Sequence, residues 1–313
     1  MRKKIEVVPY NEDWPRIFVG ESSLIKESLK DNLVDIHHIG STSVPGMDAK
    51  PIIDIIVVVN KLETSKEKLT ECGYKYRSEH DSPFRLYFTK RGGGDVNIHV
   101  YEKDNPEIEI NILFRDYLQK FPDACIEYSK LKRDLIAQDS SHQKNNSCFT
   151  GYNLGKNKFI KKILQSVNFS GVYLRICHHY EEWERYHHIR REQIFSPINI
   201  SYDINHPTIT AENQYHFVLY KGIQIVSVAQ AEILNIDEAA LRSLATDEIY
   251  KKQGYATIMM SLLEKWMKEK GVKIVRLHAS PAGEKLYRKL GYEDMYFDDI
   301  GLERDDVDLG KKL

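Results

Sequence analysis

Cysteine is scarce in this chain, too scarce to indicate a disulfide scaffold. The four residues are Cys72, Cys125, Cys148 and Cys177 among 313, and none belongs to a Cys-x-x-Cys pair. Disulfide-stabilised domains carry far more cysteine, and closely spaced pairs would indicate a zinc or redox site. The simplest interpretation is a set of reduced thiols in a cytoplasmic protein.

Long hydrophobic runs are also missing. No segment approaches the roughly 18 consecutive apolar residues that a membrane-spanning helix requires. The first residues, Met1 to Glu6, are charged but precede no apolar stretch, so they do not resemble a signal peptide. We therefore expect a cytoplasmic protein with no membrane partner.

Neither half of the chain has an excess of one charge. Residues 1–168 carry 26 Lys and Arg against 24 Asp and Glu, and residues 169–313 carry 19 against 22. A nucleic-acid-binding domain would show a basic excess. The composition therefore predicts no nucleic-acid partner, and it leaves the oligomeric state open.

The chain does have the length and patterning of two domains. A polar stretch over residues 139–153 predicts a loop, a short basic helix is expected over 156–165, and residues 166–171 have the composition of a linker. We place the boundary in this linker, which gives domains at 1–168 and 169–313.

Hydrophobic periodicity predicts helices and strands along both halves of the chain, the pattern of an α/β (α+β) fold. In the first half, helices are expected over 14–29, 110–120 and 122–138, and strands over 35–39, 52–59, 84–89 and 96–101. In the second half, strands are expected over 172–176, 216–220, 223–233, 239–246 and 274–279, and helices over 181–195, 257–270 and from Pro281 to Gly291.

The segment from Lys251 to Ala256 is the most informative motif of the second half. It lies between a predicted strand and a predicted amphipathic helix. Gly254 and the small Ala256 at the start of a helix allow backbone N–H groups to approach a bound anion, and the helix dipole adds positive charge. This turn is suited to a pyrophosphate, which points to a protein that uses acyl-CoA.

Residues 172–313 resemble the GNAT N-acetyltransferase superfamily. The family signature, Gln/Arg-x-x-Gly-x-Gly/Ala after the fourth strand, corresponds to Lys251-x-x-Gly254-x-Ala256, with Lys in the first position. The resemblance implies a mostly antiparallel mixed sheet and direct acetyl transfer from acetyl-CoA to an amine. The acetyl-CoA contacts that it implies are Leu244, Ala245, Thr246, Lys251, Lys252, Gln253, Gly254, Tyr255, Ala256 and Thr257.

The same resemblance implies that Tyr287 protonates the leaving CoA thiolate, a role that its phenol suits. The alternative is that its ring packs and its hydroxyl bonds locally. A general base would be a carboxylate near the central strands, and Glu232 and Glu238 are the candidates. The alternative for them is a solvated turn, and His278 is interpreted as a packed histidine. No metal is expected at this site.

Residues 4–166 resemble the GrpB family. Its hallmark, Gly-Ser-Thr-Ser-Val-Pro-Gly followed by Lys-Pro-Ile-Ile-Asp, is present at 40–46 and 50–54. That family resembles the nucleotidyltransferases, in which a Gly-Ser turn grips a phosphate and paired acids on a strand hold two Mg²⁺ ions. Here Asp54 is present, but Ile56 occupies the second acidic position and Asn97 and His99 stand where a third acid would.

A polar cluster suited to a phosphate or nucleotide is still expected in the first half. Its members are Gly40, Ser41, Thr42, Ser43, Lys50, Asp54, His99 and Arg115, with His38. The alternative is a structural turn beside a satisfied buried carboxylate. Because a polar group on an apolar strand must be paired or functional, Asp54 stays of interest under both interpretations.

Three functions follow in order of preference. The first is an acetyl-CoA-dependent N-acetyltransferase whose GrpB-like domain presents or recognises the acceptor. The second is nucleotidyl transfer in the first domain with Mg²⁺ and a nucleotide, against which the count of acids argues. The third is a non-catalytic protein that binds acyl-CoA or a nucleotide. The acceptor, a small-molecule or peptide amine, is not specified by the sequence.

Overall fold

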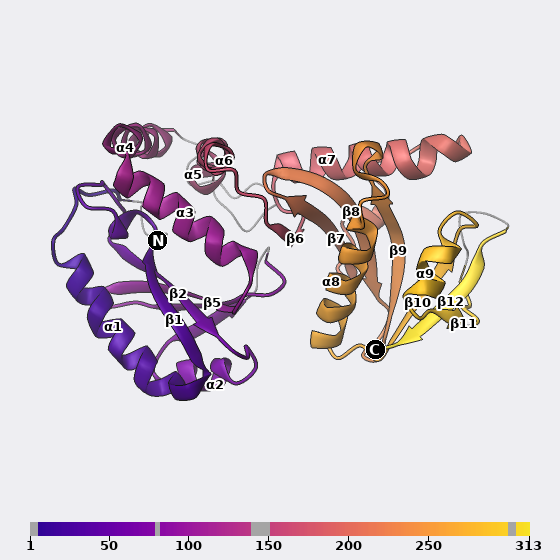
Figure 1. Cartoon of the computed structure of the whole chain (residues 1–313), viewed down its shortest axis with the longest axis horizontal. Helices are drawn as coiled ribbons and strands as arrows, with labels where there is room; N and C mark the ends of the chain where they lie inside the picture. The colour runs from indigo at the N-terminus through magenta and orange to yellow at the C-terminus, as the bar shows by residue number, and fades with distance from the viewer. Residues whose placement is uncertain (1–5, 79–81, 139–150, 300–304) are drawn as a thin grey trace. The chain divides into compact units, whose positions relative to one another are not determined.

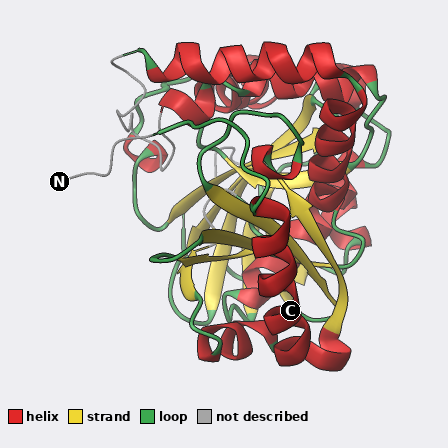
Figure 2. Cartoon of the chain, turned by 90° about the vertical axis from the view of Figure 1, so that its left-hand side faces the viewer, coloured by secondary structure: helices red, strands yellow, loops and turns green. Residues whose placement is uncertain are grey.

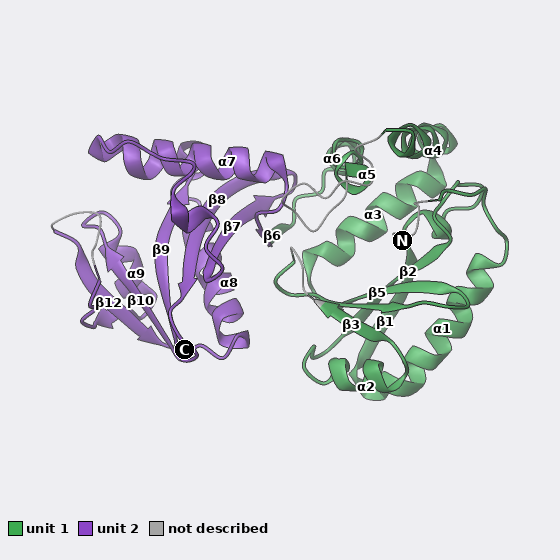
Figure 3. Cartoon of the chain, turned by 180° about the vertical axis from the view of Figure 1, so that it is seen from behind, with its two compact units in different colours: residues 1–173 green, residues 174–313 purple. Residues whose placement is uncertain are grey.

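The computed structural model describes residues 6–78, 82–138, 151–299 and 305–313. The chain divides into two compact units, residues 1–173 and 174–313 (Figure 3). The predicted loop over 139–153 lies mostly outside the described residues, as does Cys148, while Cys72, Cys125 and Cys177 are free thiols. Within the described chain, no helix is both long and apolar enough to cross a membrane.

The first unit is a five-stranded mixed sheet with helices on both faces (Figures 1 and 2). Its helices are α1 (Trp14–Leu29), α2 (Ser65–Glu71), α3 (Pro106–Lys120), α4 (Pro122–Ile136), α5 (Gly151–Leu154) and α6 (Asn157–Ser166). Its strands are β1 (Leu33–Ile39), β2 (Ile52–Val59), β3 (Lys75–Ser78), β4 (Leu86–Lys90) and β5 (Asp95–Glu102). The order is β1-β2-β5-β4-β3, and only β2 and β5 run parallel.

Strand β2 is apolar except at Asp54, because both of its faces are covered. Ile53, Ile55 and Val57 point to the core that α1 contributes to through Ile25 and Leu29. The alternate residues of β2 face the other way, where Ile56 and Val58 pack with Ile39, Tyr101 and Ile108 of α3. Asp54 belongs to this second face, since side chains two apart on a strand share a face.

The second unit is built on a seven-stranded sheet. Its strands are β6 (Val172–Ile176), β7 (Gln214–Lys221), β8 (Gln224–Ile233), β9 (Glu238–Thr246), β10 (Ile274–Ala279), β11 (Glu293–Asp294) and β12 (Val307–Lys312), in the order β11-β12-β10-β9-β8-β7-β6. Its helices are α7 (Tyr180–Arg190), α8 (Tyr255–Glu269) and α9 (Glu284–Lys289), with a π-helical turn over 191–195 and short 3₁₀ turns over 196–198, 207–209 and 248–250.

Helices α7 and α8 cover opposite faces of this sheet. Phe217 of β7 packs against Trp266 of α8, with ring centroids 4.9 Å apart. The neighbouring His216 faces the other side, where its Nδ1 lies 2.8 Å from the hydroxyl of Tyr186 on α7. The predicted mixed, mostly antiparallel sheet flanked by helices is confirmed.

Five short elements were not predicted: α2, β3, α5, β11 and β12. Strand β12 has the sequence Val-Asp-Leu-Gly-Lys-Lys, whose apolar content is too low to indicate a strand. It forms because its backbone pairs with β10 along six residues.

Candidate functional site

The central feature of the second unit is a gap that opens between β9 and β10. The two strands run parallel but pair at only three positions, ending with Ala240 opposite Arg276. Strand β9 continues to Thr246, and β10 to Ala279, without further pairing to each other. Beyond Ala240, the edge of β9 that faces β10 therefore carries backbone groups that do not pair with a neighbouring strand.

A β-bulge at Arg242 sets which backbone groups face the gap. Ala231 lies opposite Leu241, but the next residue of β8, Gln230, lies opposite Ser243. After the bulge, the carbonyl of Ala245 is directed to β8, where it accepts a 2.7 Å hydrogen bond from Ser227 Oγ.

Because successive residues of a strand present their backbone groups to alternate sides, those of Leu244 and Thr246 point to the gap. An extended ligand can add to this edge as a strand would.

The loop that follows β9 places a second set of unused donors beside the gap. Gly254, at φ +88°, is the N-cap residue directly before α8, and a Cβ there would meet nothing within 4 Å. Among the described residues, no backbone acceptor is found for the N–H groups of residues 252–257. N–H groups without a backbone acceptor at the start of a 15-residue helix are suited to binding an anion.

The two lysines of this loop have different environments. Lys251 Nζ is turned away to Glu248, with which it forms a 2.6 Å ion pair. Lys252 is exposed and has φ +61°, an uncommon conformation for a residue with a side chain. The anion-binding capacity of the loop therefore depends on its backbone.

Tyr287 lies on α9 after the end of β10. Its ring packs edge-on against Tyr292, with centroids 5.8 Å apart. Burial raises the pKa of Tyr287, so the phenol stays protonated at neutral pH. Its hydroxyl forms no hydrogen bond with another described residue, so the proton is available to a ligand.

Glu232 is held at the point where β9 and β10 separate. Its Oε2 accepts a 2.6 Å bond from Arg242 Nε, and its Oε1 accepts a 2.8 Å bond from Asn213. Arg242 also pairs with Asp299 and lies over the ring of Phe297 at 5.5 Å. Glu232 is thus part of an ion-paired network rather than a solvated turn.

Glu238 lies at the first residue of β9, on the closed side of the gap. It pairs with Arg276 at 2.8 Å, and this hydrogen bond holds the pKa of the carboxyl below its usual value. A carboxylate with a lowered pKa is a weak base. Of the two candidates, Glu232 is the one that lies level with the start of the gap.

His278 is packed, and it stacks on Phe297 with centroids 4.8 Å apart. Its Nδ1 lies 2.9 Å from Asp308 Oδ1. Sequence reasoning did not find the cluster of Arg242, Phe297, Asp299 and Asp308 around this histidine. Its members come from separate strands and loops, and no local pattern joins them.

In the first unit, the Gly-Ser turn packs directly on Asp54. Gly40 has φ +70° and ψ −173°, and a Cβ there would lie 2.6 Å from Asp54 Oδ2. Asp54 Oδ1 accepts a 2.7 Å bond from Asn97 Nδ2, and His99 Nε2 lies 4.0 Å away. Burial raises the pKa of Asp54, although the Asn97 bond opposes this.

Three of the predicted phosphate ligands instead hold the turn together. Thr42 Oγ1 bonds to His38 Nε2 at 3.0 Å and to the Ile52 carbonyl at 3.3 Å. Ser43 Oγ donates to the Gly40 carbonyl at 2.6 Å. Arg115 donates to the His38 carbonyl at 3.1 Å and pairs with Asp116. These contacts support the structural interpretation for Thr42, Ser43 and Arg115.

Ser41, Lys50 and Asp54 are brought together with two further lysines. Lys132 Nζ donates to Ser41 Oγ at 2.9 Å and also to the Asp48 carbonyl. Lys50 and Lys156 share the ring of Tyr152, at 3.9 and 4.7 Å from its centroid. Lys132 lies over Tyr128 at 4.8 Å.

The sequence does carry a signal for these residues. Tyr128 and Lys132 are four residues apart on α4, the spacing that places two side chains on one face of a helix, and Tyr152 and Lys156 have the same spacing across the turn after α5.

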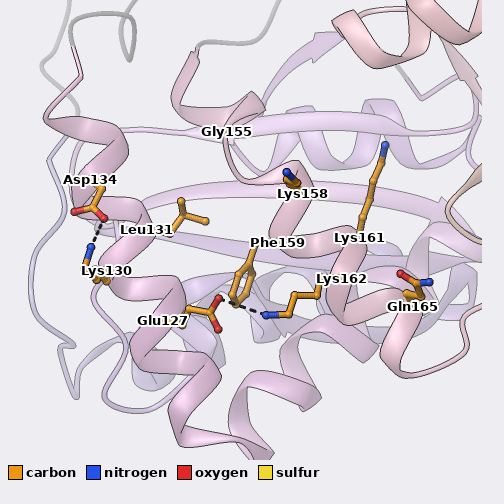
Figure 4. A pocket seen from close by; sticks show the side chains of 10 residues that line it. All are labelled: Glu127, Lys130, Leu131, Asp134, Gly155, Lys158, Phe159, Lys161, Lys162 and Gln165. Carbon is orange, nitrogen blue, oxygen red and sulfur yellow. Dashed lines mark hydrogen bonds and ion pairs between the residues drawn. The ribbon is translucent and has the colours of Figure 1, made fainter.

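A separate groove of about 700 Å³ lies between α4 and α6 (Figure 4). Two of its lysines are compensated by ion pairs, Lys130 with Asp134 at 2.6 Å and Lys162 with Glu127 at 3.6 Å. The residues that line it include neither Asp54 nor the three lysines around it. The groove is therefore distinct from the polar cluster.

Comparison with known proteins assigns both halves. The family model described as GrpB protein matches residues 4–166, more than half of the chain. The chain belongs to the GrpB family. The model of the acetyltransferase (GNAT) family matches residues 175–292, so this GrpB protein also carries a GNAT domain.

Individual relatives cover one half at a time. UPF0157 protein YqkA of Bacillus subtilis (strain 168) is 39% identical over 166 residues, which are 51% of this chain and 46% of that protein. The match therefore spans less than half the length of this relative.

The crystal structure of GrpB from Enterococcus faecalis is 34% identical and covers 51% of this chain and 96% of its own, with a TM-score of 0.46. PaiA N-acetyltransferase from Thermoplasma acidophilum, in complex with coenzyme A, is 16% identical. It covers 46% of this chain and 99% of its own, with a TM-score of 0.38.

Proposed function

We propose that the second unit of this GrpB protein transfers an acetyl group from acetyl-CoA directly to an amine. The observation that carries the proposal is the combination of the open edge of β9 with the unused N–H groups of residues 252–257. The loop would hold the pyrophosphate. Leu244 and Thr246 would pair with the pantetheine arm and orient the thioester in the gap.

Tyr287 is the proposed acid. Its protonated, unbonded phenol can donate to a thiolate, whose conjugate acid has a pKa of about 8.5 in a free thiol. Glu232 is the carboxylate that we propose for the amine's proton. Its ion pair with Arg242 holds the carboxylate at the start of the gap, so we assign it to orienting the amine and accepting its proton through water. Glu238 is not part of this proposal.

The first test is calorimetry with acetyl-CoA. Wild-type protein should bind it, and Gly254→Val should not, because a branched side chain at φ +88° disrupts the loop. Absence of binding by the wild type at high micromolar ligand would refute the proposal.

The second test is Tyr287→Phe, assayed with a panel of amines that includes polyamines, aminoglycosides and peptides. General-acid catalysis contributes about 10²- to 10⁴-fold, so kcat should fall by about that factor while the Kd for acetyl-CoA changes little. If the variant keeps wild-type kcat, Tyr287 is not the acid.

The acceptor is proposed to be a small-molecule or peptide amine. The segment over 196–213, which precedes β7, would shape this choice because loops near a rigid sheet commonly set specificity.

A further inference from the structure

The first unit contains three amines whose charge is not balanced within the fold. Among the described residues, no carboxylate lies within 4 Å of Lys50, Lys132 or Lys156. Asp48, next to Lys132, is paired with Arg133 instead. Asp54 is the acid that acts on Lys50 and Lys156, and its effect is smaller than that of burial.

The three amines form one electrostatic group. Burial is the main cause and the charge of Lys156 the second, and together they lower the pKa of Lys132 to about 7. The same two causes, in the same order, bring the pKa of Lys50 to about 8. Lys156 is thus the common neighbour of the other two amines.

Burying this much positive charge is unfavourable unless a partner compensates it. Lys132 is only 1% exposed, and its contacts are the neutral oxygens of Ser41 and Asp48 and the ring of Tyr128. Rings and neutral oxygens offset part of the cost. An anion would offset the rest.

Backbone donors converge on the same place. Ser41 and Thr42 begin the 3₁₀ turn that follows Gly40, and no backbone acceptor among the described residues is found for their N–H groups. Ser41 also receives the hydrogen bond from Lys132. Ammonium groups, a hydroxyl and backbone N–H groups are the donors that phosphate oxygens accept.

We propose that this cluster binds the phosphate group of a small phosphomonoester, and that it does so without a divalent metal ion. One carboxylate among three ammonium groups leaves a net positive site, which repels Mg²⁺ and attracts a dianion. The position two residues after Asp54 is Ile56, fully buried, so a second acid cannot join it from β2.

The aromatic rings favour a phosphate over a stacked base. Tyr128 and Tyr152 are 4% and 2% exposed, and ammonium groups already lie over their faces. Neither ring has a face left for a nucleobase. Solvent reaches Asp54 and His99, whose side chains are 30% and 21% exposed.

The test is calorimetry of the full chain with inorganic phosphate, with AMP and with glucose 6-phosphate, each in EDTA and again with Mg²⁺. Wild-type protein should bind at least one of the three in EDTA, and Mg²⁺ should not strengthen binding. Binding at pH 8 should take up protons, measured from the difference between two buffers, because the lysines become fully charged around the anion.

Lys132→Met should weaken binding by about 10- to 100-fold, the usual effect of losing one charged hydrogen-bond donor. Lys50→Gln provides a second variant with the same expected loss, so the test survives if one variant does not fold. Lys130→Met is the matched control on the same helix, since its side chain is 72% exposed and paired with Asp134. It should bind as the wild type does.

The proposal would be overturned by absence of heat with every probe at roughly 10 mM, by a requirement for Mg²⁺, or by unchanged affinity in both Lys132→Met and Lys50→Gln. The variant Gly254→Val shows which unit binds the phosphate. If this variant loses phosphate binding, the ion binds to the second unit and the proposal is wrong.

Discussion

Replacing Lys132 with methionine should make the ligand-free first unit more stable at neutral pH. The amine is buried, and its pKa falls from 10.5 to about 7. Between these values the unfolded chain binds more protons than the folded one, so stability rises with pH across this window. The methionine variant has no such group and lacks this dependence.

The magnitude follows from the two pKa values. Holding the amine in the fold costs about 4 kcal/mol at pH 7 and about 2 kcal/mol at pH 9. The variant also loses the hydrogen bonds from Lys132 to Ser41 and to the Asp48 carbonyl, each worth about 1 kcal/mol. The net gain should be about 2 kcal/mol at pH 7 and close to zero at pH 9.

The assay must report on the first unit alone. The chain has three tryptophans, and only Trp14 belongs to residues 1–173. Urea unfolding of 5-fluorotryptophan-labelled protein, followed by ¹⁹F NMR of the Trp14 resonance, gives the free energy of unfolding of this unit. Trp183 and Trp266 report on the other unit in the same spectra.

Lys130→Met is the control, and it should change the free energy by less than about 0.5 kcal/mol at both pH values, as exposed substitutions do. The reasoning is refuted if Lys132→Met is less stable than the wild type at pH 7, or if its difference from the wild type is the same at pH 7 and pH 9.

Three further outcomes are expected. Gly40→Ala should lower the stability of the first unit by about 2–4 kcal/mol in the same urea assay, because only glycine tolerates this backbone conformation and the new Cβ would meet Asp54. The control Gly46→Ala, which has open space around its Cβ, should cost about 1 kcal/mol. Asp54→Asn should tighten phosphate binding about 3- to 10-fold by calorimetry, since it removes the one negative charge of the cluster; weaker binding would mean that the carboxylate is needed. Glu232→Gln should lower kcat for acetyl transfer by about 10- to 100-fold and flatten the pH profile of kcat, whereas Glu238→Gln should leave both unchanged. Equal effects of the two variants would contradict the role proposed for Glu232.

The predicted elements that the structure confirms have strong local patterns. The helix over 14–29 and the strand over 52–59 were predicted with the bounds that the structure gives. The first has the hydrophobic period of an amphipathic helix. The second has the nearly continuous apolar run of a strand that is buried on both faces. The elements that were missed, such as β12, form through pairing with a distant strand.

By itself, the sequence determined the two families, because their signatures are contiguous. Lys251 to Ala256 and Gly40 to Asp54 can each be read as one segment, and both are turns whose backbone geometry depends on glycine.

Only the tertiary structure decided the chemistry around these turns. The gap between β9 and β10 depends on where two strands stop pairing, and the lysines around Asp54 come from three helices or loops that are distant in sequence. The order of residues along a chain does not encode such distances, because they arise from packing. Packing also showed that the predicted ligands Thr42, Ser43 and Arg115 hold the turn, while Lys132 and Lys156 supply its charge.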